Sequence, residues 1–91
     1  MRIRVELYGI PRLRAGTNEI VVAVEAQPVT LGAVIRRLAQ QYPGLAAECF
    51  DGDLLREGFV ANIGGEQFIS APDSPLTGDR PLLIMSADAG G

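Results

Sequence analysis

The sequence contains no histidine and no lysine, so two side chains on which much protein chemistry depends are missing. Histidine is the residue most often used for acid–base catalysis near neutral pH, and it is the commonest metal ligand. We therefore expect no catalytic residue in this chain, no metal site and no bound cofactor. All eight basic residues are arginine, which is most simply a compositional bias of the genome.

Cysteine and long apolar runs are also scarce. Cys49 is the only cysteine, which excludes an internal disulfide and fits a reducing compartment. Its neighbours suggest a partly buried small apolar side chain, with a redox or persulfide-bearing thiol as the alternative. No apolar run approaches the roughly 18 residues of a membrane span. The start, residues 1–4, is typical of a strand instead of a signal peptide, so we expect a cytoplasmic protein.

Excess positive charge is absent too. Eleven acidic residues against eight basic ones give a net charge of −3, which favours neither nucleic acid nor an anionic membrane as a partner. Proteins are the expected partners. The 91 residues, 47% of them hydrophobic, suffice for one soluble domain with a single core, and we expect a monomer when the protein is free.

The first third of the chain predicts two strands and a helix. Residues 2–8 alternate apolar and charged side chains, residues 9–18 are punctuated as a loop, and residues 19–25 form a β-branched run that we expect to pair antiparallel with the first strand. Thr30 is a good N-cap for a helix whose apolar residues recur with helical spacing at Leu31, Val34, Ile35 and Leu38. Residues 42–44 should end it.

The remainder predicts three more strands. Residues 45–57 are expected to be a loop, with or without a helical turn. Residues 59–63 and 67–69 should form a hairpin around Gly64-Gly65, a dipeptide suited to a type I′ turn. After loops at 71–75 and 77–81, residues 82–85 form the last strand. This order predicts an α+β fold, the ubiquitin-like β-grasp, with a mixed sheet of about five strands, central first and last strands, and one main helix. We expect a domain over residues 1–86 and an exposed tail over 87–91.

That tail ends in Gly90-Gly91. Two residues without side chains can be threaded into a narrow channel, since glycine adopts almost any backbone conformation and allows close approach of another backbone. The carboxylate of Gly91 is unhindered, and Ala89 and Asp88 would enter the same channel. A frayed end without function is the alternative.

Several segments in this order resemble the small sulfur-carrier proteins of the MoaD/ThiS superfamily, including the carrier of thiocarboxylate-dependent cysteine synthesis. The resemblance covers nearly the whole chain and rests on Leu13-Arg14 with Gly16, residues 30–38, Tyr42-Pro43-Gly44-Leu45, residues 63–66, Leu76-Thr77-Gly78-Asp79 and the final diglycine.

The resemblance implies a carrier and not an enzyme, although it would also suit the non-catalytic small subunit of a sulfurtransferase such as molybdopterin synthase. An E1-like enzyme would use ATP-Mg to adenylate Gly91, and a persulfide or sulfide would then displace AMP to give a thiocarboxylate. The acceptor would be an enzyme of the molybdopterin synthase large-subunit, cysteine synthase or thiazole synthase type. In this setting the lack of lysine has a second explanation, avoidance of self-acylation by the activated terminus.

The chain departs from the family pattern in three places. Gly64 stands where family hairpins usually carry asparagine, a change that should preserve the turn. Ser86, Ala87 and Asp88 are small or acidic where apolar residues or proline are common, which leaves open which activating enzyme accepts this tail. Residues 45–57 are longer than in the shortest thiamin-type carriers, which favours the molybdopterin or cysteine-synthesis branches.

Docking requires a surface near the tail. The last strand is apolar on both sides, so one side should face solvent as a docking patch unless the strand is central and buried twice. The candidate docking residues are Phe59, Phe68, Leu83, Ile84 and Met85.

Three other motifs give little indication of a functional site. Asp51-Gly52-Asp53 lacks the remaining ligands of a calcium loop and is read as a solvated turn. Gly64-Gly65 is not a phosphate loop, because no Lys-Ser/Thr follows. Asp79 is expected to shape the turn before the last strand. Two other functions stay open: a ubiquitin-like modifier conjugated through Gly91, and a non-covalent β-grasp interaction module.

Overall fold

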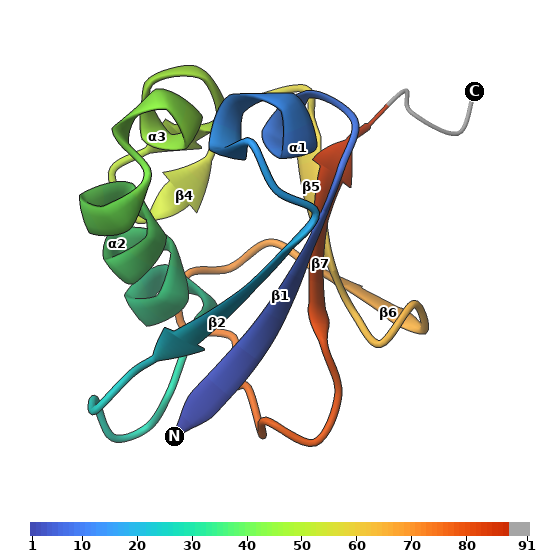
Figure 1. Ribbon diagram of the computed structural model, residues 1–91. Helices are drawn as coiled ribbons and strands as arrows, with labels where there is room; N and C mark the ends of the chain where they lie inside the picture. Colours follow the sequence, from blue (N-terminus) through green and yellow to red (C-terminus); the bar gives the residue numbers. More distant parts are fainter. Residues whose placement is uncertain (88–91) are drawn as a thin grey trace.

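A computed structural model describes residues 1–87 and shows a five-stranded mixed sheet with the strand order β2-β1-β7-β5-β6. The two central strands, β1 (Arg2–Tyr8) and β7 (Leu82–Ser86), run parallel (Figure 1). The other strands, β2 (Glu19–Ala23), β5 (Phe59–Ile63) and β6 (Gln67–Ile69), pair antiparallel with their neighbours. The predicted β-grasp fold with central first and last strands is confirmed.

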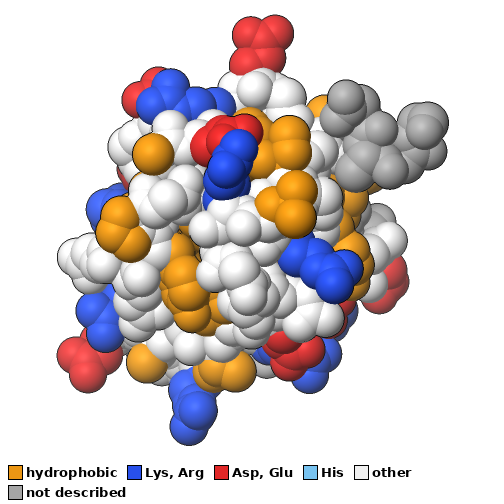
Figure 2. Space-filling view, turned by 45° about the horizontal axis from the view of Figure 1, so that its top comes forward, with side chains coloured by type: hydrophobic (Ala, Val, Ile, Leu, Met, Phe, Trp, Pro, Cys, Tyr) orange, Lys and Arg blue, Asp and Glu red, His pale blue; other side chains and the backbone are white. Residues whose placement is uncertain are grey.

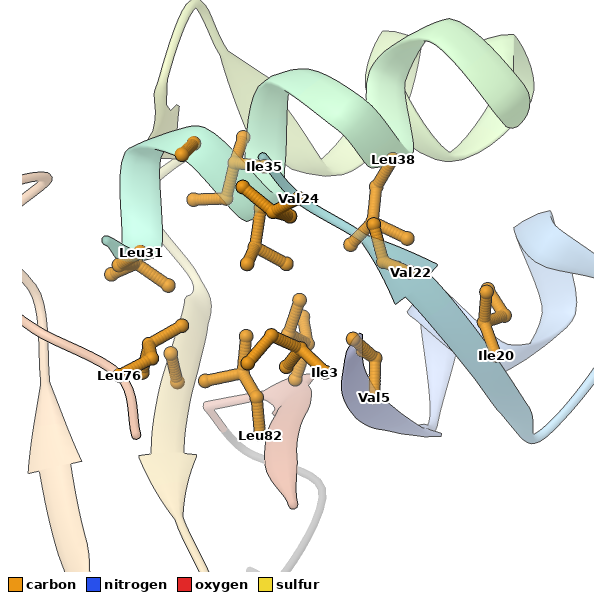
Figure 3. Close-up of a cluster of buried hydrophobic side chains, with 14 of the residues drawn as sticks. Ile3, Val5, Ile20, Val22, Val24, Leu31, Ile35, Leu38, Leu76 and Leu82 are labelled. Atoms are coloured by element: carbon orange, nitrogen blue, oxygen red, sulfur yellow. The ribbon is translucent and has the colours of Figure 1, made fainter. Parts of the chain in front are cut away.

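The helices lie on one side of this sheet and leave its other face open (Figure 1). The longest is α2 (Leu31–Gln41), which begins as predicted: the side chain of Thr30 accepts a hydrogen bond of 3.2 Å from the N–H of Ala33. Its apolar face packs on the inward side chains of β1, β2 and β7, which form the core together with Leu76 (Figure 3). Because a helix covers one face only, each strand has an inner and an outer set of residues.

The prediction of a loop over residues 9–18 is wrong, because a helix, α1 (Ile10–Ala15), occupies most of it. The glycines and the proline of this segment, which suggested a loop, mark the two ends of α1. Gly9 precedes the helix with φ 68°, Gly16 follows it with φ 75°, and buried Pro11 lies in its first turn, where no backbone N–H is needed. Six residues are too few for a detectable helical period.

For residues 45–57 the prediction of a loop is wrong over most of the segment, although the helical turn that it allowed is present. Helix α3 (Pro43–Cys49) begins immediately after α2, and a short hairpin of β3 (Phe50–Asp51) and β4 (Leu54–Leu55) follows it. The sequence signal that ends α2 also opens α3, because proline is favoured in the first turn of a helix. Leu45 and Cys49, four residues apart, are both fully buried on one side of α3.

The hairpin between β5 and β6 has the predicted turn. Gly64 and Gly65 have φ values of 63° and 78°, and the N–H of Glu66 donates a 3.0 Å hydrogen bond to the carbonyl of Ile63. Positive φ at both central positions is the mark of the type I′ turn. Within residues 1–87, no helix is both long enough and apolar enough to cross a membrane.

Candidate docking face beside the C-terminal segment

The end of β7 is fixed to three other segments. β7 pairs with β1 on one side and with β5 on the other. The N–H of Ile10 donates a 3.2 Å hydrogen bond to Oγ of Ser86, and the N–H of Ala87 donates a 2.7 Å bond to the carbonyl of Gly58. Ala87, which we assigned to the tail, is therefore still bonded to the domain. The other tail residues, Asp88, Ala89, Gly90 and Gly91, lie outside the described residues, so their predicted roles stay predictions.

The two faces of β7 differ in burial. Leu82 and Ile84 point inward and are almost completely buried, whereas Leu83 and Met85 point outward and are half-buried. The prediction of Ile84 as a docking residue is wrong, since its side chain, 0% exposed, belongs to the core. Leu83 and Met85 remain candidates, because strand alternation places them on the face that no helix covers.

The register across the strands shows what surrounds these two residues. Leu83 lies opposite Asn62 on β5, Met85 lies opposite Val60, and Phe68 on β6 lies opposite Asn62 from the other side. Residues directly opposite one another point to the same face. We name this set the sheet patch: Val60, Phe68, Leu83 and Met85. Phe68 is 70% exposed, which makes it the most accessible apolar side chain of the patch.

Phe59 does not belong to the sheet patch. It lies opposite Ser86, so it shares the inner face and packs, half-buried, against the core. It does line a shallow hollow of about 340 Å³ with Phe68, at the side of β5 where β6 ends. Four of the five predicted docking residues thus remain near one another, and they are divided between the sheet patch and the rim of this hollow.

The outer side chains of β1 are polar, and three of them interact with one another. The hydroxyl of Tyr8 donates a 2.5 Å hydrogen bond to the carboxylate of Glu6, and Arg4 lies 3.9 Å from the same carboxylate. The hydrogen bond to Glu6, followed by desolvation, raises the pKa of Tyr8. Figure 2 shows acidic and basic side chains interspersed, with no extended area of one sign on this view of the molecule. The open face is therefore polar over β1 and, apart from Asn62, apolar over β7, β5 and β6.

Sequence reasoning missed Tyr8, Val60 and Asn62 at this face. Tyr8 lies beside Met85 in the parallel pair, and Val60 and Asn62 lie beside β7 in the antiparallel pair. The alternation within residues 59–63 already separates Val60 and Asn62 from Phe59, Ala61 and Ile63. What the sequence lacked was the register, which decides which of the two sets faces outward.

The other candidate motifs are structural. Cys49 is fully buried, and its surroundings raise the pKa of its thiol to about 11, chiefly through desolvation. Asp53 accepts a 3.2 Å hydrogen bond from Arg36, and no group of three or more potential metal ligands occurs within residues 1–87. The hydroxyl of Thr77 donates to Asp79, which lowers the pKa of that carboxyl and supports its predicted place in the turn.

Comparison with solved structures finds the same fold in proteins of low sequence identity. Small archaeal modifier protein 1 (SAMP1) of Haloferax volcanii matches over 100% of both chains with a TM-score of 0.80 and 18% identity. SAMP1 of Methanosarcina acetivorans matches 99% of this chain and 96% of its own, with a TM-score of 0.72 and 22% identity.

A third protein of the same fold is not described as a modifier. A putative molybdopterin converting factor, subunit 1, from Pyrococcus furiosus matches 94% of this chain and 97% of its own, with a TM-score of 0.73 and 14% identity. No protein-family model matches the sequence, and a search of curated proteins found no match. The chain therefore has the ubiquitin-like β-grasp fold, which it shares with these small archaeal modifier proteins and with the putative molybdopterin converting factor subunit.

Proposed function

We propose that this protein is a sulfur carrier that is adenylated and then thiocarboxylated at Gly91. The observation that carries the proposal is the placement of β7. This strand is central in the sheet, bears the sheet patch on its outer side, and leads directly to the sequence Asp88-Ala89-Gly90-Gly91. The likeness to a molybdopterin converting factor subunit supports a role in sulfur transfer.

The proposed chemistry needs a second protein, because a carboxylate is a poor electrophile. An E1-like enzyme would bring the Gly91 carboxylate to the α-phosphorus of ATP-Mg, forming the acyl-adenylate and releasing pyrophosphate. Attack by hydrosulfide then releases AMP and leaves the thiocarboxylate; a persulfide would leave an acyl disulfide, which a second thiol cleaves. The carrier would supply docking and reach, with about 3.3 Å gained per extended residue beyond Ala87.

The test is intact-mass analysis of the purified full chain after incubation with ATP-Mg, sulfide and an E1-like enzyme from the same organism. We expect the mass to rise by the difference between sulfur and oxygen, and tandem fragmentation to locate the change at Gly91. The matched control is a variant lacking Gly91, which should stay unmodified. An unchanged mass of the full chain with an enzyme active on its other carriers would contradict the proposal.

A second candidate is a protein modifier conjugated through Gly91 to lysine side chains of other proteins. The names of three of the matching structures favour it, since each is of a small archaeal modifier or SAMP1. Both candidates share the adenylation step, so they differ only in the nucleophile that accepts the activated glycine.

Cell extracts distinguish the two candidates. A tagged full chain should appear in higher-mass adducts if it is a modifier, and trypsin should leave a remnant of its terminal residues on target lysines. Because the chain has no lysine, adducts should not extend into side-chain-linked polymers. A carrier that is not a modifier would show the thiocarboxylate mass and no adducts.

A further inference from the structure

Asn62 is a buried polar residue in the centre of an otherwise apolar region. Its side chain is only 4% exposed although it lies on the open face of the sheet. Its Oδ1 atom is shielded from solvent and has no hydrogen-bond partner within residues 1–87. A shielded polar group without a partner is destabilising, so Asn62 does not owe its place to the stability of the free domain.

The neighbours of Asn62 explain why its Oδ1 atom has no partner among residues 1–87. Leu83 and Phe68 flank it in the two strand ladders, and neither has a polar side-chain atom. The stem of Arg80 lies over the end of β5, where a Cβ on Gly64 would be 3.1 Å from its Cδ. The guanidinium of Arg80 is directed to Glu66, at 3.8 Å, and makes no hydrogen bond to Asn62.

The position also runs against local preference. Asparagine is depleted in strands, and a β-branched or leucine side chain would fit between Leu83 and Phe68 without an unpaired atom. Residues that contradict the local secondary-structure preference and do not stabilise the fold are concentrated at functional sites. Ser86, the other buried polar residue on these central strands, differs in that its hydroxyl is satisfied by the N–H of Ile10.

We infer that Asn62 is a specificity contact for the enzyme that activates the C-terminus: a hydrogen-bond donor of that enzyme pairs with Oδ1 of Asn62 when the sheet patch is covered. The inference rests on the proposed function. Leu83, directly opposite Asn62, belongs to the strand that leads to Gly91. The flanking ring of Phe68 is 70% exposed, so a partner that covers the sheet patch would contact this ring as well as Asn62.

The apolar residues and Asn62 then have different tasks. Burial of Phe68, Leu83 and Met85 supplies affinity for any apolar surface, which is not selective. An unpaired polar atom among them penalises a partner that offers no donor and favours one that does. The chemical requirement on the partner is therefore an apolar surface with one N–H or O–H group at its centre.

The experiment measures initial rates of ATP–pyrophosphate exchange by the E1-like enzyme of the same organism over a range of carrier concentrations. For Asn62→Leu we expect KM for the carrier to rise about tenfold, the value of one net hydrogen bond of about 1.4 kcal/mol, with kcat unchanged. The midpoint of thermal unfolding should stay equal or rise. Asn62→Ala, which adds no bulk, should raise KM by a similar factor. Gln41→Leu, which removes an exposed amide on α2, is the matched control and should leave KM unchanged.

Three outcomes would overturn the inference: KM of Asn62→Leu within twofold of the wild type, a rise in KM with leucine but not with alanine, or a lower unfolding midpoint in both variants, which would mean a structural role. Failure of the proposed adenylation of Gly91, on which the inference rests, looks different, because the wild-type chain would then support no exchange at all. Failure of the later sulfur-transfer step would leave exchange intact and would be seen only as the missing thiocarboxylate mass.

Discussion

Oγ of Ser86 accepts a hydrogen bond from the N–H of Ile10, at 3.2 Å across 76 positions of sequence. This bond joins the end of the last strand to the first residue of α1, which has no side-chain cap of its own at Gly9. The unpaired N–H groups of a helix start need acceptors from elsewhere. Ser86 supplies one, and it thereby holds β7 in place one residue before the last described residue, Ala87.

We predict that Ser86→Ala lowers the free energy of unfolding by about 1 kcal/mol, because the Ile10 N–H then loses its acceptor in a partly buried position. Urea unfolding followed by circular dichroism measures the change, and the slope of the transition should stay constant. A variant as stable as the wild type would mean that water replaces the hydroxyl.

Removal of the helix cap at Thr30 provides a comparison for the loss of stability predicted for Ser86→Ala. Thr30→Ala removes the acceptor of the Ala33 N–H and should cost about 1 kcal/mol in the same assay, whereas Thr30→Ser should cost less, since serine caps as well as threonine. Equal losses in both variants would assign the effect to the methyl group of Thr30 instead of its hydroxyl.

Because the sheet patch lies on the open face, we predict that a substitution in it can prevent docking and leave the domain folded. Leu83→Asp should abolish thiocarboxylate formation, because a charge would be buried against the partner, while the domain remains folded at a cost of about 1 kcal/mol from facing Glu6. Val21→Asp is the matched control: it lies on the same open face, opposite Arg4, but on the edge strand β2. Wild-type loading of Leu83→Asp would remove the patch from the docking model.

For Ile84 we predict the opposite of Leu83: a substitution should lower stability and leave loading intact, because this side chain is part of the core. Ile84→Ala should destabilise the domain by about 2 to 5 kcal/mol through lost burial and the resulting cavity. Thermal unfolding measures the loss, and the variant that remains folded at low temperature should still be loaded. Selective loss of loading in a fully stable Ile84→Ala protein would contradict the assignment of this side chain to the core.

Cys49 predicts a pH dependence of stability. The pKa of its thiol rises from 9.0 in the reference state to about 11 in the folded protein. Between these values the folded state holds the proton that the unfolded state releases, so stability falls as pH rises through this window. The stability advantage of the wild type over Cys49→Ala should therefore shrink between pH 9 and 11, by up to about 2 to 3 kcal/mol. A constant difference would contradict the shifted pKa.

Much of the fold could be predicted because each of the correctly predicted elements has a clear local sequence pattern. The alternation in residues 2–8, the helical spacing after Thr30 and the paired glycines at 64 and 65 each specify local geometry through side-chain chemistry alone. The two short helices were missed for the reverse reason. Six and seven residues hold less than two turns each, and their glycine and proline end signals are the same residues that mark loops.

The candidate site divides in the same way. From the sequence, Leu83, Met85 and Phe68 were predicted at the docking surface, and the structure places all three on the open face. Ile84 and Phe59 were assigned with them because an apolar strand has no internal sign of which side is covered. The strand register together with the position of the helices decides this, and the helices cover the side to which Ile84 and Phe59 point.

The sequence by itself determined the chemistry that this chain can offer: no imidazole, no lysine amine, one thiol, and Gly90-Gly91 after an apolar strand. It also determined the β-grasp order, since the periods of its segments are local properties. The tertiary structure alone decided that Leu83 faces outward, that Oδ1 of Asn62 beside it has no partner within residues 1–87, and that Ser86 is bonded to Ile10. Each of these depends on the register of strands far apart in the chain, and a one-residue shift of that register would reverse the faces of β7.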